Sequence, residues 1–261
     1  MHGDTLPPAA DTGARHTARR AEGPGPWNDG AMPTTPLPRP LRVGFWIAGV
    51  LLVVNLGAAT LLALEIGDAG LLEQLRVALM WALLPPIWIA LLALGALRHA
   101  VGRWHVAAAV LCGLGDGLGA TTGITIVLLG LFLLGHIAYL VALWPTRRRS
   151  LAWGPAAIAY AVIALIAGGV IAIGAGPLAV PVLLYSLVLA AVAALAAIDV
   201  PGLLGGLLFM VGDLVLGLGL FVVDIPDPLR SIVVLVAYAA AQALLALSLQ
   251  QRLRLGLAVV P

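Results

Sequence analysis

Eight long apolar runs follow a polar segment of about 40 residues, and only short polar stretches separate one run from the next. Most of the runs contain about 20 residues, which is the length that an α-helix needs to cross a bilayer. The sequence therefore predicts an all-α fold, a polytopic transmembrane bundle of about eight spans. The predicted spans cover residues 43–64, 76–97, 104–120, 122–144, 152–173, 177–198, 202–223 and 229–249.

Two breaks inside the apolar pattern refine these boundaries. Residues 119–123 read Gly-Ala-Thr-Thr-Gly and are all that separates the third predicted span from the fourth. Glycine-rich stretches favour turns, so we expect two helices joined by a tight turn rather than one helix of 41 residues. Pro85 and Pro86 fall inside the second span and predict a kink there, because proline cannot continue the helical hydrogen bonding.

The two ends of the chain differ in composition from the apolar region. Residues 1–41 are rich in Pro, Gly, Ala and Arg, and we expect a disordered cytoplasmic tail because they offer little apolar surface to bury. A cleaved signal peptide is a poorer interpretation, since its polar start would be too long. Residues 42–251 form the predicted eight-span transmembrane domain, and residues 252–261 form a short cytoplasmic C-terminal tail.

Charge is scarce and segregated. Of the 261 residues 62% are hydrophobic and 10% are charged, with a mean hydropathy of +1.08, which excludes a water-soluble globular protein. Eight crossings with the N-terminus inside place all but two of the 14 arginines, Arg76 and Arg230, on the inner side. Positive charge collects on the cytoplasmic side of membrane proteins. The sequence thus predicts a multi-pass protein of the cell membrane with both termini in the cytoplasm, and its basic residues indicate membrane orientation rather than nucleic-acid binding.

Asp116 and Asp213 lie inside the third and seventh predicted spans. A carboxylate near the bilayer centre costs roughly 2.5–3.5 kcal/mol on insertion scales, so each needs a reason. Both follow a glycine and lie on helices that run in the same direction, which suggests two parallel four-helix repeats with both carboxyls in one central cavity. The competing interpretation is structural, with each neutral Asp bonding a neighbouring helix. We favour the functional one.

Other polar side chains mark the neighbouring spans. His136 and Tyr139 are three residues apart, and Tyr238 and Gln242 are four apart, so each pair shares one face of its helix. Tyr185 lies in the sixth span. These five residues are candidates for positioning a substrate or water, although a single histidine on an apolar helix is as often only a hydrogen-bonding group.

Glycine recurs at every second position beside Asp116, from Gly113 to Gly119. Residues two apart cannot share one face of a regular helix. We therefore expect the helix to be locally distorted there, which would open room for substrate or water.

In their order and spacing, five segments resemble the YhhN-like lysoplasmalogenase family of eight-span membrane proteins. The segments are Leu111-Cys-Gly-Leu-Gly-Asp116, Leu134-Gly-His136-Ile-Ala-Tyr139, Pro181-Val-Leu-Leu-Tyr185, Leu208-Phe-Met-Val-Gly-Asp213 and Tyr238-Ala-Ala-Ala-Gln242. The resemblance covers nearly all of the chain after residue 42. One departure is Gly212, where the family usually has serine, so a role of that hydroxyl does not carry over.

The resemblance implies hydrolysis of the vinyl ether bond of lysoplasmalogen, a lysophospholipid in the bilayer. Such hydrolysis starts with proton transfer to carbon and passes through an oxocarbenium ion, so it needs an acid and nearby negative charge. Asp116 and Asp213 fit these two roles, in an order that the sequence leaves open. His136, Tyr139, Tyr185, Tyr238 and Gln242 would then bind the substrate or water, and no cofactor or metal is implied.

Two alternatives use the same residues. A proton-coupled transporter would employ the two buried carboxyls as a proton relay. A metal-dependent hydrolase would bind its metal through Asp116, Asp213 and His136, although no motif with several histidines supports it. The lone Cys112 allows no intramolecular disulfide, and the oligomeric state stays open.

Overall fold

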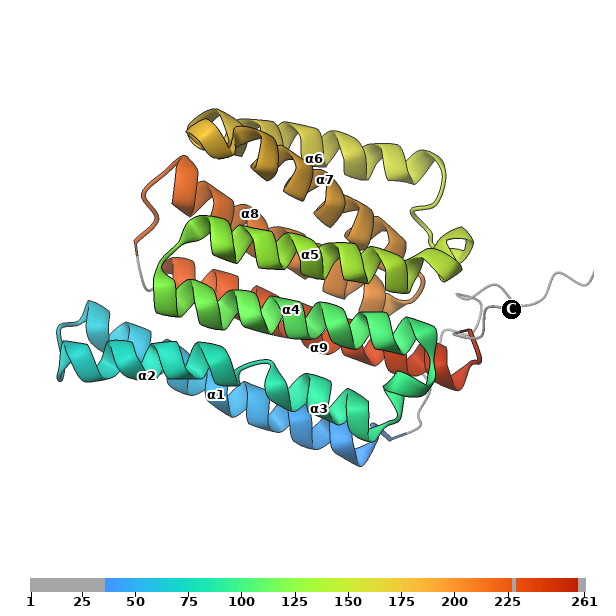
Figure 1. The fold of residues 1–261 in the computed structure, drawn as a ribbon, viewed down its shortest axis with the longest axis horizontal. Helices are drawn as coiled ribbons and strands as arrows, with labels where there is room; N and C mark the ends of the chain where they lie inside the picture. Colours follow the sequence, from blue (N-terminus) through green and yellow to red (C-terminus); the bar gives the residue numbers. More distant parts are fainter. Residues whose placement is uncertain (1–35, 227–228, 258–261) are drawn as a thin grey trace, which may run out of the picture. The chain divides into compact units, whose positions relative to one another are not determined.

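A computed structural model describes residues 36–226 and 229–257, and all regular secondary structure within these residues is helical. The helices lie side by side, and consecutive spans alternate in direction (Figure 1). The α-helices are α1 (Arg39–Ala63), α2 (Ala69–Ala82), α3 (Pro85–Ala93), α4 (Ala100–Thr122), α5 (Thr125–Leu143), α6 (Pro155–Gly174), α7 (Ala179–Ala196), α8 (Val200–Phe221) and α9 (Leu229–Arg254). Three short 3-10 helices, at Ala96–Arg98, Trp144–Arg149 and Gly176–Leu178, lie in the connections.

The prediction of a polytopic helical bundle is confirmed, with α2 and α3 together making one span. α2 ends at Ala82, and α3 starts at Pro85, whose ring and missing N–H prevent continuation of the preceding helix. α4 ends at Gly123, which adopts a left-handed conformation (φ 66°), so the third and fourth spans are separate helices. Seven helical stretches in the described part are long and apolar enough to cross a membrane. α4 is not one of them, because Arg103, His105, Asp116 and its glycines lower its hydropathy.

The distortion expected in the glycine-rich part of α4 is wrong, because α4 remains an α-helix throughout. Residues two apart point to nearly opposite sides of a helix, which turns by 100° per residue. A Cβ atom on Gly117 would collide with the ring of Trp81 on α2, and one on Gly115 would meet the ring of Phe132 on α5 at 2.6 Å. The alternating glycines thus let α4 pack closely between two helices.

The described residues change the expected ends of the membrane domain by a few positions. α1 starts at Arg39, so the last residues of the predicted tail are helical, and residues 1–35 lie outside the described part. α9 continues to Arg254, past the predicted start of the C-terminal tail at residue 252. Arg252 is almost completely buried, with 1% of its surface exposed.

The connections divide by charge between the two ends of the bundle. We call one the arginine end; it holds the start of α1, the end of α9, the connections that carry Arg98 and Arg147–Arg149, and Arg103 in the first turn of α4 (Figure 1, right). The other, acidic end carries Glu65, Asp68, Glu73 and Asp224. That the arginine end faces the cytoplasm stays a prediction from the distribution of positive charge.

Helix contacts agree with two four-helix repeats. Each half of the described chain consists of two hairpins, α1 with α2 and α3, then α4 with α5, and likewise α6 with α7, then α8 with α9. Between the halves, α5 packs against α7, and α9 packs against α1, α3 and α4. The contacts of α5 with α7 and of α9 with α3 would be equivalent under parallel repeats, and α4 and α8, which carry the two aspartates, would be equivalent helices.

Candidate functional site

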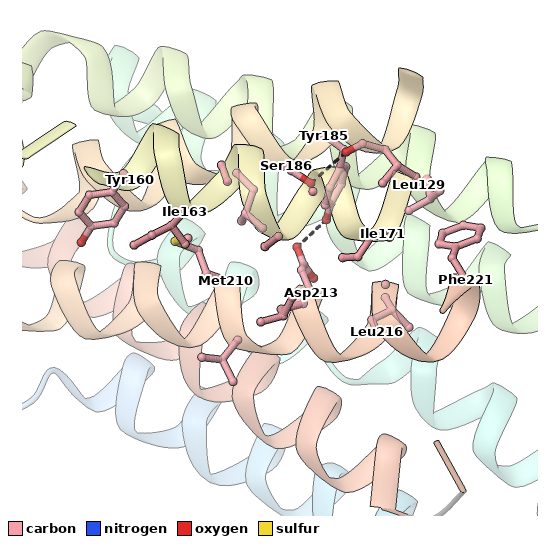
Figure 2. A pocket seen from close by; sticks show the side chains of 18 of the residues that line it. Leu129, Tyr160, Ile163, Ile171, Tyr185, Ser186, Met210, Asp213, Leu216 and Phe221 are labelled. Atoms are coloured by element: carbon pink, nitrogen blue, oxygen red, sulfur yellow. Dashed lines mark hydrogen bonds between the residues drawn. The ribbon is translucent and has the colours of Figure 1, made fainter. Parts of the chain in front are cut away.

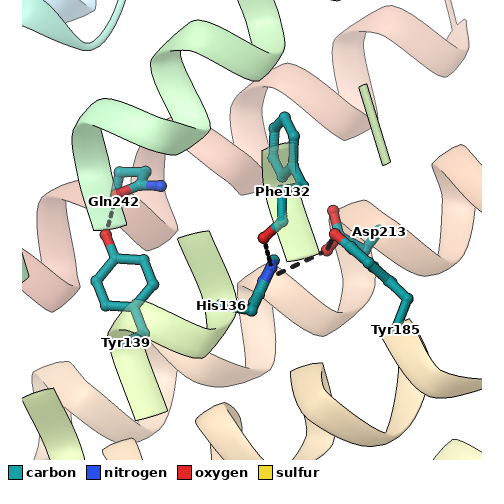
Figure 3. Close-up of polar contacts among 6 residues, drawn as sticks. All are labelled: Phe132, His136, Tyr139, Tyr185, Asp213 and Gln242. Carbon is teal, nitrogen blue, oxygen red and sulfur yellow. Dashed lines mark hydrogen bonds and ion pairs between the residues drawn. The ribbon is translucent and has the colours of Figure 1, made fainter. Parts of the chain in front are cut away.

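Asp213 on α8 is held by side chains from two other helices (Figure 3). The hydroxyl of Tyr185 on α7 donates a hydrogen bond of 2.5 Å to Asp213 Oδ2. Nε2 of His136 on α5 lies 3.8 Å from the same oxygen. That separation is too long for a direct hydrogen bond. The packing of α5 on α7 therefore brings His136 and Tyr185, which are 49 positions apart in the sequence, to the same carboxyl.

His136 is completely buried, and its surroundings define which nitrogen carries the proton. Nδ1 lies 2.6 Å from the carbonyl oxygen of Phe132, one helical turn earlier, and the carbonyl can only accept. In the neutral ring Nδ1 is therefore the donor, and Nε2, which has no hydrogen-bond partner among the described residues, is the acceptor. The rings of Tyr185 and Phe209 contact His136 in edge-on geometry and fix its orientation.

Asp116 on α4 is the second carboxyl of the site and lies deeper in the bundle. The hydroxyl of Tyr238 on α9 lies beside it, and Asp213 is close enough to interact with it electrostatically. Within the described structure Asp116 Oδ2 and the Tyr238 hydroxyl are buried without a hydrogen bond of normal geometry. That the two carboxyls act together stays a prediction.

Tyr139 and Gln242 extend the polar interior toward the arginine end. The Tyr139 hydroxyl donates a hydrogen bond of 2.5 Å to Gln242 Oε1, which joins α5 to α9 (Figure 3). Gln242 is also a neighbour of the thiol of Cys112, one turn before Asp116 on α4. Gln242 Nε2 donates no hydrogen bond to any of the described residues.

Sequence reasoning missed two phenylalanines that shape the site. The ring of Tyr238 packs against Phe132 and Phe209, with ring centroids 5.6 Å apart in both pairs. Both phenylalanines also contact His136. They therefore lie between the Asp213 and Asp116 parts of the site. Phe132 precedes His136 by four residues and Phe209 precedes Asp213 by four, so helical periodicity could have identified them.

A cavity of about 590 Å³ lies between α6, α7 and α8 and reaches Asp213 (Figure 2). Its walls are aliphatic for most of their extent, and Tyr185, Ser186 and Asp213 are polar exceptions. Ile163, which lines the cavity from α6, is 54% exposed, so the cavity opens toward the surface that faces lipid. Ligand sites commonly have this size and this mixture of apolar wall and few polar groups.

The structure brings all seven predicted site residues into one region of the bundle. Asp213 and Tyr185 line the cavity, His136 lies behind them, and the remaining four form the deeper part around Asp116. Within the described residues, no three His, Cys, Asp or Glu side chains are arranged to hold a metal ion. The geometry combines a membrane-facing apolar cavity with a carboxyl, a hydroxyl and an imidazole, which suits acid-base chemistry on a lipid.

Comparison with known proteins agrees with this arrangement. The YhhN family model matches residues 77–249, a region that includes every predicted site residue and leaves out α1. No curated protein and no solved structure matches the chain. Because the match covers well over half of the 261 residues, the chain belongs to the YhhN family.

Proposed function

We propose that this protein hydrolyses the vinyl ether bond of lysoplasmalogen. The products are a fatty aldehyde and a glycerophospho-amine, such as glycerophosphoethanolamine or glycerophosphocholine. The observation that carries the proposal is the position of Asp213, a carboxyl bonded to Tyr185 on the wall of an apolar cavity that opens toward lipid. The resemblance to lysoplasmalogenases directs the choice of bond.

The cavity has the dimensions of a lipid tail. On α8 its lining runs from Leu207 to Phe221, which corresponds to about 21 Å at 1.5 Å per residue. One leaflet of the hydrocarbon core is about 15 Å thick. From Asp213 the lining continues for about 12 Å to Phe221. A lysolipid with the first carbons of its chain at Asp213 could place the next part of that chain along this stretch.

The reaction requires an acid that reaches carbon. Asp213 lines the cavity and Asp116 does not line it, so we assign proton donation to Asp213. The proton of the Asp213 carboxyl forms a C–H bond at the β-carbon while the carbon-carbon double bond breaks, which leaves an oxocarbenium ion. Water adds to the α-carbon and returns one proton to Asp213, and the resulting hemiacetal releases the aldehyde and the glycerol hydroxyl.

Tyr185 and His136 assist different steps. The Tyr185 hydroxyl donates to Asp213 Oδ2 and stabilises the negative charge that develops when the proton leaves. Nε2 of His136 offers a lone pair 3.8 Å from Asp213, where it could accept a hydrogen bond from the attacking water.

Asp116 contributes charge rather than contact. It interacts electrostatically with Asp213 from the interior, and Tyr238 lies beside it. A negative carboxyl at this depth would stabilise the oxocarbenium ion, because charges interact strongly where water is excluded.

The test uses purified protein in detergent with three lysolipids that differ only at the first bond of the chain. The vinyl ether lipid should release fatty aldehyde without any ion gradient. A saturated alkyl ether has no double bond to accept a proton and should inhibit competitively without being cleaved. An ester lysolipid should survive, because no Gly-x-Ser-x-Gly nucleophile motif occurs in the sequence.

Mass spectrometry of the aldehyde formed in D2O gives a second measurement. One deuterium should be retained on the carbon next to the carbonyl when it is read before enol exchange. Absence of aldehyde in all conditions would contradict the proposal and favour a proton-coupled transporter. Loss of activity with a chelator would indicate a metal-dependent hydrolase, and free fatty acid released from the ester as fast as aldehyde would refute the mechanism.

A further inference from the structure

A row of buried polar side chains connects Asp116 to the arginine end of the bundle. We call it the polar row, and its members come from α4, α5 and α9. In order from the site they are Asp116, Tyr238, Gln242, Tyr139, His105 and Arg252. All six are at least nine-tenths buried. On α4 the row extends from Asp116 to His105, which is about 16 Å along the helix axis.

Tyr238 and Gln242 are one turn apart on α9 and therefore share a face of that helix. Beyond the Tyr139 hydrogen bond to Gln242, the ring of His105 packs edge-on against Tyr139 with centroids 4.9 Å apart. His105 in turn interacts electrostatically with Arg252 on α9. The positions agree with helix geometry, because His105 precedes Asp116 by eleven residues, or three turns, and therefore shares its face.

The row ends at groups that approach the surface. Arg252 Nη2 donates to the hydroxyl of Ser248 at 3.2 Å, and that hydroxyl donates to Asp199 Oδ2 at 2.9 Å. Asp199 is half-buried and caps the start of α8, where its Oδ1 accepts from the N–H of Gly202. The start of α8 lies at the arginine end, so the row reaches the face that we expect in the cytoplasm.

Most of the row is unsatisfied by the described protein atoms. Polar atoms in five of its six side chains are buried without a hydrogen-bond partner there: Asp116 Oδ2, the Tyr238 hydroxyl, Gln242 Nε2, His105 Nδ1, and Arg252 Nε and Nη1. Buried polar groups in proteins are nearly always bonded to protein or to ordered water. One isolated exception would have little meaning, but a continuous series indicates a missing partner that is small and can both donate and accept.

We infer that the polar row holds a file of water molecules that supplies the hydrolytic water to the Asp116 and Asp213 site from the arginine end. The inference rests on the proposed function, because vinyl ether hydrolysis consumes one water and returns its proton to the acid. The reaction therefore needs net delivery of water and no net delivery of protons. The cavity between α6 and α8 is apolar and faces hydrocarbon, so it is a poor source of water.

The experiment measures water directly as well as activity. Hydroxyl radicals produced by radiolysis of bound water oxidise side chains next to that water, and Cys112, the single cysteine, lies beside Gln242 in the row. The wild-type protein in lipid nanodiscs is compared with His105→Phe, which keeps a ring against Tyr139 but removes both nitrogens. The matched control is His105→Gln, which keeps polar atoms, and Arg252→Met interrupts the row at its other end.

We expect fast oxidation of Cys112 in the folded wild type and most of it to be lost in His105→Phe and Arg252→Met. In the same two variants kcat should fall while KM for the lipid stays unchanged. His105→Gln should retain both the fast oxidation of Cys112 and the wild-type kcat. Thermal unfolding verifies that each variant is folded. A general loss of stability would not separate His105→Phe from His105→Gln in this way.

Slow oxidation of Cys112 in the wild type would overturn the inference whatever the enzyme does. Normal aldehyde release by a folded His105→Phe whose Cys112 is protected would also overturn it, because the water would then arrive by another path. Fast oxidation of Cys112 together with no aldehyde from the wild type would contradict the proposed function and leave the file of water supported.

Discussion

Replacing Tyr185 with phenylalanine removes one hydroxyl group and leaves the rest of the site in place. The hydroxyl donates to Asp213 Oδ2 at 2.5 Å, whereas the edge-on contact with His136 is made by the ring and is retained. When Asp213 gives its proton to the substrate, negative charge grows on this carboxyl and the hydrogen bond strengthens in the transition state.

The size of the effect follows from that single bond. A hydrogen bond to a charged group contributes about 1.5–3 kcal/mol. Because 1.36 kcal/mol corresponds to a factor of ten in rate, kcat of Tyr185→Phe should fall roughly 10- to 150-fold. KM should stay the same, since the lipid chain still occupies the same apolar wall.

The assay is aldehyde release from the vinyl ether lysolipid over a range of substrate concentrations, and Tyr160→Phe is the control. Tyr160 lines the same cavity from α6 and lies away from Asp213, so the identical chemical change should leave kcat nearly unaltered (Figure 2). Unchanged kcat in Tyr185→Phe, or an equal loss in both variants, would refute the assignment of Asp213 as the acid that Tyr185 supports.

Further changes test the remaining parts of the proposal. Asp213→Asn and Asp116→Asn should each lower turnover by roughly 100- to 10,000-fold without loss of the folded bundle, and full activity in either would remove that carboxyl from the mechanism. Ala167→Phe narrows the lipid cavity and should raise KM for long chains more than for short ones; equal effects on both would place the chain elsewhere. Glu73→Cys and Asp224→Cys in a Cys112→Ala background should react with impermeant thiol reagents from outside, whereas labelling from the cytoplasm would invert the topology. Asp68→Ala and Asp199→Ala both remove helix caps worth about 1 kcal/mol; Asp199→Ala should lower the unfolding temperature more, because it also loses Ser248, and equal losses would argue against that contact.

The helices could be predicted from sequence because their limits depend on local chemistry. Apolar runs define the spans. Pro85 and Gly123 interrupt them through their own backbone chemistry, which does not depend on the surrounding helices. That Asp116 and Asp213 lie on helices that run in the same direction was also predictable, because four crossings separate α4 from α8. Helical periodicity places His105 on the face of Asp116. Its position near the start of a span gave no sign that it is buried.

Features that depend on packing between distant helices were not predictable. The cavity forms where α6, α7 and α8 meet, and nothing in any one of these runs taken alone indicates that space. The alternating glycines of α4 suggested distortion, whereas their actual partners, Trp81 and Phe132, come from two other helices. Arg252 looked like part of an exposed tail until the extension of α9 placed it inside.

The polarity of α4 has a consequence for the biogenesis of the protein. The glycines and Asp116 that build the site make α4 the least apolar of the spans, so it gains little by partitioning into lipid from the translocon. α5 follows after a turn of two residues and is strongly apolar. We therefore expect α4 to await its neighbour and insert with it as a helical hairpin. A ribosome-bound chain from which α4 but not α5 has emerged should leave α4 accessible to water, and emergence of α5 should draw both helices into the bilayer.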